Sequence, residues 1–169
     1  MKIAVHLAFH EGGAVRLLNW LAGENARILR ARPDLPGLYE SGVTYVREQD
    51  ESWPDYLNML AQGHDDCDGL AAARAGELLG RGWKALAPDE PGYNAARQRR
   101  LKSIKAQVFL KTRSEPGSPG LYHCLVRYRI GRQTFVDDPS ARLGMSGPID
   151  PSVRARWNRE LTPSNWRTA

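Results

Sequence analysis

The stretch His64-Asp65-Asp66-Cys67-Asp68-Gly69-Leu70 predicts the start of a helix that carries a cysteine in its first turn. Asp65 or Asp66 can cap this helix, because a carboxylate accepts hydrogen bonds from the free N–H groups of a first turn. Apolar residues then recur at helical spacing until two glycines end the pattern. The stripe consists of Cys67, Leu70, Ala71, Ala75, Leu78 and Leu79, and the glycines are Gly80 and Gly82. Arg74 interrupts the stripe, so either its stem snorkels or its guanidinium pairs with an acid.

The position of Cys67 makes it a candidate nucleophile. The reactive form of cysteine is the thiolate, and a helix N-terminus lowers the pKa of a thiol through its dipole and its free N–H groups. The flanking aspartates raise the same pKa, so the site needs a cationic partner, and a histidine would supply one.

A predicted strand, Leu121–Ile130, offers that histidine. Alternate residues from Tyr122 to Ile130 form its apolar face, and His123 lies on the opposite face. Gly131-Arg132 predicts a two-residue hairpin loop, which pairs Ile130 with Gln133 and Leu125 with Asp138. Asp138 is then the diagonal neighbour of His123 on the same face, while Asp137 points the other way. A slip of one residue in this register would reverse the choice.

Three segments carry a resemblance to a known family. They are Asp66-Cys67-Asp68-Gly69-Leu70-Ala71 at a helix start, Tyr122-His123 on a strand, and Asp138-Pro139-Ser140. In this order they resemble the transglutaminase-like branch of the papain-like superfamily, and in particular its small members encoded by tailed phages and prophages. There a segment like Glu51-Ser52-Trp53 precedes the cysteine, and a Leu-Gly-Met like Leu143-Gly144-Met145 follows the acid. The resemblance covers about residues 36–145.

The resemblance implies an α+β fold in which the nucleophile-bearing helix packs on an antiparallel sheet. It implies that Cys67 is the nucleophile, His123 the general base and Asp138 its orienting acid. The backbone N–H of Cys67 would form half of an oxyanion hole, and Gln62 or Trp53 is the candidate for the other donor. The expected function is that of a cysteine hydrolase or acyl-transferase acting on an amide bond of a protein or peptide, with neither cofactor nor metal.

Other interpretations stay open. In one of them both residues are structural, with Cys67 a buried helix cysteine and His123 a strand histidine whose hydrogen bonds are satisfied within the fold. The segment 64–68 holds metal-competent side chains, although consecutive residues rarely converge on one ion. Asp-Cys-x-Gly also resembles the start of peptidoglycan cysteine endopeptidases. The Asp138-Pro139 segment fits the pattern of that family less well. Finally, the fold can serve as a non-catalytic docking protein of a phage particle.

Length and patterning predict a single domain over residues 1–146, with its core at about 36–145 and an N-terminal strand and helix in 1–35. Strands are expected at 1–9, 106–113, 120–130 and 133–137, a helix at 53–62 and a loop at 85–94. No apolar run approaches the roughly 20 residues that span a bilayer. Residues 1–10 alternate in polarity unlike a signal peptide, so we expect synthesis in the cytoplasm, with virion association if the protein joins a particle.

Two basic regions bear on partners. Residues 97–105 hold five basic residues and no acid, and we interpret them as a solvated face because no aromatic residue is interleaved. Residues 147–169 are expected to form a C-terminal arm that binds other phage subunits, because aromatic and arginine side chains dominate interface hot spots. Its candidate contacts are Trp157, Trp166, Arg154, Arg156 and Arg159. Neither a membrane nor nucleic acid is expected as a partner.

Overall fold

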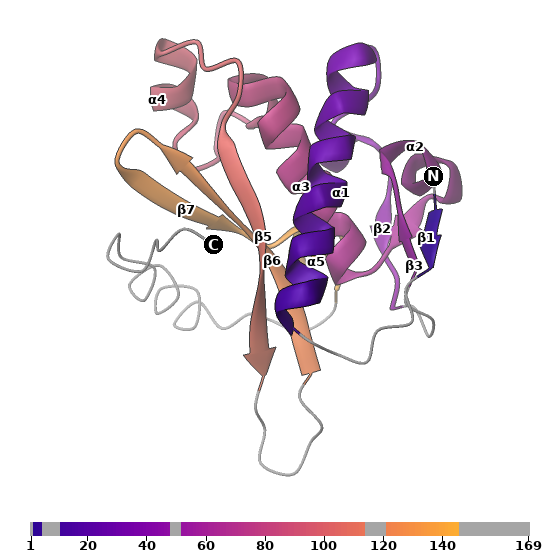
Figure 1. The fold of residues 1–169 in the computed structure, drawn as a ribbon. Helices are drawn as coiled ribbons and strands as arrows, with labels where there is room; N and C mark the ends of the chain where they lie inside the picture. Colours follow the sequence, from indigo (N-terminus) through magenta and orange to yellow (C-terminus); the bar gives the residue numbers. More distant parts are fainter. Residues whose placement is uncertain (1, 5–10, 48–51, 114–120, 146–169) are drawn as a thin grey trace.

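Three antiparallel strands form the main sheet of a mixed α+β fold (Figure 1). The structure is a computed structural model, and it describes residues 2–4, 11–47, 52–113 and 121–145. The main sheet has the order β5 (Lys105–Arg113), β6 (Leu121–Ile130) and β7 (Gln133–Asp137). Two short pairs lie on the other side of the long helices, β1 (Lys2–Ala4) with β3 (Ser52–Pro54) and β2 (Thr44–Tyr45) with β4 (His64–Asp65).

Two long helices occupy the middle of the molecule. α1 (Glu11–Ala31) and α3 (Cys67–Arg81) pack side by side, and α3 also lies against β5 and β6. The helix that carries Cys67 therefore packs on an antiparallel sheet, as the sequence predicts. The other helical segments are η1 (Leu38–Glu40), α2 (Tyr56–Gln62), η2 (Gly82–Ala85), α4 (Tyr93–Gln98) and α5 (Pro139–Arg142).

Buried apolar side chains form two clusters, and α1 and α3 contribute to both. The first fills the space between these helices and the main sheet, with Leu18, Ala72 and Val126 among its members. The second lies under η1 and α2 and includes Leu29, Leu38 and Leu70. Because neighbouring residues of α3 point into different clusters, this helix is buried on nearly all sides.

The close approach of α1 and α3 depends on glycine. A Cβ placed on Gly76 would lie 2.5 Å from the Cβ of Asn25 and 2.8 Å from the carbonyl oxygen of Ala22. Asn25 cannot easily move, because it is fully buried and its Oδ1 accepts a hydrogen bond from the backbone N–H of Tyr56 at 2.8 Å. The helices could accommodate a larger residue only by separating.

We expect Gly76→Ala to lower the free energy of unfolding by about 1–3 kcal/mol, the usual cost of overpacking a core. Gly23→Ala is the matched control, because a Cβ at this exposed position on α1 meets nothing within 4 Å. Alanine has the higher helix propensity, so this change should leave stability equal or raised by up to about 1 kcal/mol. Urea unfolding of both variants checks the pair, and equal effects of the two changes would contradict the packing argument.

Arg74 is fully buried and has the largest side chain among the fully buried residues of the described chain. Its guanidinium forms ion pairs with Glu77 at 2.9 Å, with Glu90 at 2.8 Å and with Asp137 at 2.8 Å. Of the two possibilities that the sequence allowed, pairing with acids is therefore the one observed. Asp137 also accepts a hydrogen bond from the Tyr39 hydroxyl at 2.7 Å. The network joins α3, the loop before α4 and the end of β7.

The elements match the sequence predictions in the sheet and differ at one helix start. The strands at 106–113, 120–130 and 133–137 are present as β5, β6 and β7 within a residue. The helix predicted over 53–62 begins only at Tyr56, because Asp55 caps it by accepting the Asn58 N–H at 3.0 Å, while Ser52–Pro54 pairs with β1. The predicted loop 85–94 holds the end of η2 and the start of α4. Of the strand predicted at 1–9, residues 2–4 are a strand and the rest lies outside the described residues.

Candidate functional site

Cys67 is the first residue of α3. Asp66 caps the helix, and its carboxylate accepts a hydrogen bond from the backbone N–H of Asp68 at 3.3 Å. The segment just before it is held by the β2–β4 pair, in which Tyr45 lies opposite Asp65. The backbone N–H of Cys67 belongs to the first turn, where N–H groups have no acceptor within the helix. The sulfur thus lies at the positive end of a 15-residue helix.

His123 and Asp138 meet as the hairpin register predicts. Ile130 pairs with Gln133 and Val126 with Asp137, so β7 ends one residue before Asp138. Asp138 caps α5 with one carboxylate oxygen, which accepts the Ala141 N–H at 3.1 Å. The other oxygen lies 3.0 Å from Nε2 of His123. Asp138, and not Asp137, is therefore the carboxylate that contacts the histidine.

The side chains of Cys67 and His123 are close enough for each to shift the pKa of the other toward its charged form. Since Nε2 of His123 faces Asp138, Nδ1 is the ring nitrogen left for the sulfur. The three predicted triad residues therefore lie together, with the imidazole between the thiol and the carboxylate. They come from α3, from β6 and from the turn between β7 and α5.

The electrostatics of the pair favour the charged forms of both groups. A hydrogen bond with Cys124 is the largest influence on the pKa of Cys67, and with the bond to His123 it outweighs burial and lowers this pKa to about 6. Burial alone would lower the pKa of His123, but its hydrogen bonds to Asp138 and Cys67 prevail and raise it to about 9. Near neutral pH both shifts favour a Cys67 thiolate beside a His123 imidazolium.

Cys124 is the neighbour that sequence reasoning did not assign to the site. It is buried on β6 directly after His123, and both cysteines are free thiols. Its hydrogen bond to Cys67, together with burial, raises the pKa of the Cys124 thiol. The neighbouring thiols are thus shifted in opposite directions, Cys67 toward the thiolate and Cys124 away from it. The alternation of residues 121–130 placed Cys124 on the apolar face and gave no sign of this contact.

Tyr45 is a second residue that the sequence did not single out. Burial raises the pKa of its hydroxyl, and the negative charges of Cys67 and Asp66 raise it further. Tyr45 therefore keeps its proton at neutral pH, and it lies close enough to Cys67 for the two side chains to interact electrostatically. A parallel pair between residues 44–45 and 64–65 brings it there, and such a short parallel contact has no sequence signal.

The two candidate oxyanion donors have other acceptors in the structure. The only N–H of the Trp53 indole donates to Oδ2 of Asp68 at 2.6 Å, and Nε2 of Gln62 donates to the His64 carbonyl at 2.7 Å. Trp53 would have to release Asp68 before it could serve a substrate at Cys67. That either donor completes an oxyanion hole stays a prediction.

The acidic residues around Cys67 lie close together. Ligand atoms of Asp65, Asp66 and Asp68 are all within 4.8 Å of one another. Each of the three already accepts a hydrogen bond from the protein, from Asp66 N–H, Asp68 N–H and Trp53 respectively. These bonds explain the arrangement as the scaffold of the helix start, and we assign no metal to it.

Comparison of the chain with protein-family models, with curated proteins and with solved structures finds no match. Across the described ranges, none of the helices has the length and apolar character needed to cross a bilayer. The predicted arm, with Trp157, Trp166, Arg154, Arg156 and Arg159, lies outside the described residues.

Proposed function

We propose that this chain is a transglutaminase-like cysteine hydrolase or acyl-transferase that acts on an amide bond through Cys67, His123 and Asp138. The observation that carries the proposal is the gathering of the three side chains at the start of α3, with His123 Nε2 3.0 Å from the Asp138 carboxylate and the Cys67 thiol beside the His123 ring. A nucleophile, a base and an orienting group within hydrogen-bond reach form the arrangement that cysteine catalysis requires. The packing of α3 on β5 and β6 supports a papain-like arrangement of the fold.

The proposed reaction begins with attack of the Cys67 thiolate on the amide carbonyl carbon. A C–S bond forms, and negative charge develops on the carbonyl oxygen near the backbone N–H of Cys67. His123 then gives its Nδ1 proton to the amide nitrogen, the C–N bond breaks, and an amine leaves a thioester on Cys67. Water or a primary amine, deprotonated by the now neutral His123, attacks the thioester. The products are an acid or a new amide, and Cys67 leaves as the thiolate.

Asp138 has a positioning role in this scheme. Its bond to Nε2 fixes the ring so that Nδ1 faces Cys67. Asp138 is itself held by its cap of α5, and the residue before it is tied to Arg74 at 2.8 Å. The position of the base thus depends in part on the buried ion-pair network around Arg74.

Cys67→Ala tests the proposal directly. Glutamine-containing proteins and peptidoglycan peptides are incubated with the protein and a fluorescent primary amine, and both amine incorporation and release of ammonia or new amino groups are measured. We expect the turnover of any accepted amide to fall at least about 10³-fold, because a covalent step without its nucleophile leaves only binding and the oxyanion donors. Turnover that survives in Cys67→Ala would contradict the proposal. Cleavage confined to peptidoglycan peptides would favour the endopeptidase alternative, and no turnover by the wild-type protein would favour the docking protein.

A further inference from the structure

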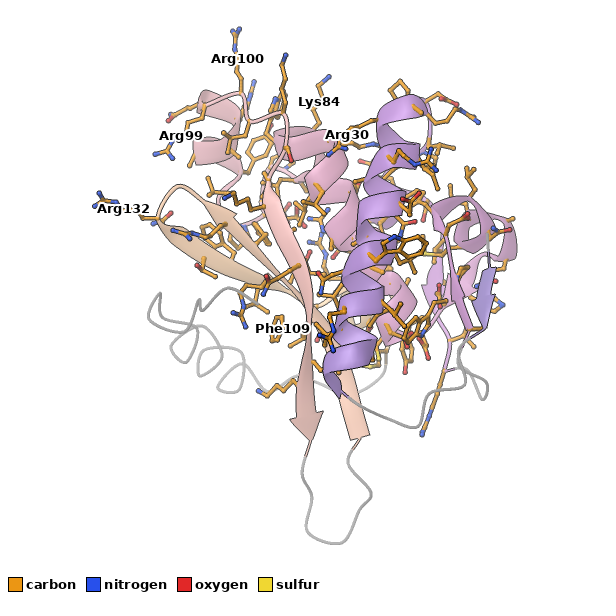
Figure 2. All side chains as sticks on the ribbon, in the orientation of Figure 1. Arg30, Lys84, Arg99, Arg100, Phe109 and Arg132 are labelled. Atoms are coloured by element: carbon orange, nitrogen blue, oxygen red, sulfur yellow. The ribbon has the colours of Figure 1, made fainter. Side chains whose placement is uncertain are left out.

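An open groove of ≈ 1190 Å³ lies at the end of the molecule opposite Cys67. It is formed where α1 and α3 end and where η2 and α4 follow. Its lining includes six cations and no described acidic residue: Arg30, Arg81, Lys84, Arg97, Arg100 and Lys102. We call this the basic groove. Figure 2 shows Arg30, Lys84, Arg99 and Arg100 gathered at this end of the molecule.

Most of this charge is not used by the fold. Arg30 donates to the Leu79 carbonyl at 2.9 Å, while Arg81 donates to the Leu35 carbonyl at 2.6 Å and forms an ion pair with Glu77 at 3.7 Å. The remaining four, Lys84, Arg97, Arg100 and Lys102, form no ion pair with an acidic residue of the described chain. These four like charges along one concavity raise the local potential, which a bound anion would lower.

Arg100 has an unusual backbone conformation at the rim of the groove. It is the only described residue other than glycine with a positive φ, 48°. It follows the end of α4 in the left-handed conformation that glycine favours at such positions, so an arginine there costs stability. Two hydrogen bonds that end α4 hold it there, from Arg100 N–H to the Arg97 carbonyl at 3.0 Å and from Leu101 N–H to the Ala96 carbonyl at 3.1 Å, and they place Arg100 at the rim of the groove.

We propose that the basic groove binds the phosphodiester backbone of single-stranded nucleic acid. Four of its cations are arginines, whose planar guanidinium suits bidentate contact with phosphate. The partly buried ring of Trp83 lies in the lining, with the Tyr93 ring 6.4 Å away and Arg97 over that ring at 5.8 Å, and aromatic rings and arginines stack on bases. In the sequence, the absence of an aromatic residue from the run 97–105 argued against a nucleic-acid partner. In the folded chain, Trp83 of η2 and Tyr93 at the start of α4 lie near this run.

An anionic membrane fits this groove less well. Membrane-binding surfaces combine cations with exposed apolar side chains. The exposed large apolar residues of the described chain are Leu17, Trp20, Val46 and Leu57, and none of them lines the groove. The site is also independent of Cys67, which lies at the other end of a 15-residue helix, about 20 Å away.

The test measures binding of a fluorescein-labelled deoxythymidine oligonucleotide of about 20 nucleotides by anisotropy, in about 50 to 200 mM salt. The wild-type protein and Cys67→Ala should bind equally, with affinity falling steeply as salt rises. Arg97→Glu combined with Arg100→Glu should lose at least about tenfold in affinity, and its salt slope should be shallower by about 1.4, because each lost phosphate contact removes about 0.7. Arg16→Glu with Arg47→Glu, which changes exposed arginines outside the groove by the same charge, should lose less than about threefold.

Arg100→Gly separates binding from stability. Glycine relieves the left-handed backbone, so this variant should unfold at a higher urea concentration than the wild-type protein while binding the oligonucleotide more weakly. No binding by the wild-type protein in about 50 mM salt would overturn the proposal. So would an equal loss in both double variants, equal binding of polyglutamate, or binding to phosphatidylserine vesicles without binding to the oligonucleotide.

Discussion

His123→Ala is expected to reduce turnover of any amide substrate by about 10²–10⁴-fold, the usual contribution of a positioned acid–base group. The variant loses the proton that the leaving amine needs, and it loses the cation that stabilises the Cys67 thiolate. The same variant can be tested without a substrate. Its loss of the imidazolium should raise the pKa of Cys67, so alkylation of Cys67 by iodoacetamide near pH 6.5 should slow by about tenfold or more.

His64→Ala is the control for this prediction. His64 lies on β4, three residues before Cys67, but its described contact is through its carbonyl oxygen and not through its ring. The control variant should retain most of the wild-type alkylation rate. If His123→Ala and His64→Ala behave alike, the contact between His123 and Cys67 has no chemical consequence and the triad is wrong.

Arg74→Met is expected to lower the free energy of unfolding by about 3–5 kcal/mol. Methionine removes the cation and leaves three carboxylates, those of Glu77, Glu90 and Asp137, without their main partner, at side-chain exposures of 4%, 5% and 11%. Burial already raises the pKa of Glu77 while the charge of Arg74 opposes it, so the lost cation would leave that carboxylate still harder to ionise. Urea unfolding at neutral pH measures the loss.

Arg32→Met is the matched control for Arg74→Met. Arg32 pairs with Asp34 at 2.6 Å, a shorter contact than any that Arg74 makes with a carboxylate, but both side chains are more than half exposed. Solvent screens such a pair, so its removal should leave the unfolding midpoint nearly unchanged. Similar losses in the two variants would show that burial does not decide the contribution of these ion pairs.

Local patterns in the sequence predicted the helix start at Cys67 and the pairing that selects Asp138. Both depend on residues close in sequence, a capping aspartate in one case and a two-residue loop in the other. A strand alternates with period two, so one correctly placed turn fixes which of two adjacent aspartates faces His123. The predicted pairing of β6 with β7 was therefore sufficient to identify Asp138 as the partner of His123.

The features that sequence patterns missed depend on distant contacts. Cys124 meets Cys67 because α3 packs on β6, and Tyr45 reaches the site through a parallel pair of two residues on each strand. Arg74 stood out only as an exception in an apolar stripe, and its three acids come from positions up to 63 residues away. The basic groove likewise joins cations from α1, α3, η2 and the α4 region, which no single window of sequence contains.

The most direct test of the proposed site is the pH dependence of Cys67 alkylation in the wild-type protein. Iodoacetamide reacts with thiolates, so its rate at each pH, resolved by mass spectrometry of the two cysteine peptides, reports the pKa of each thiol. The Cys67 rate should rise to half its plateau near pH 6, while Cys124 should remain unlabelled in the folded protein. An ordinary cysteine titrates at about pH 8.5. A midpoint for Cys67 at or above that pH would contradict the thiolate–imidazolium pair and the function proposed from it.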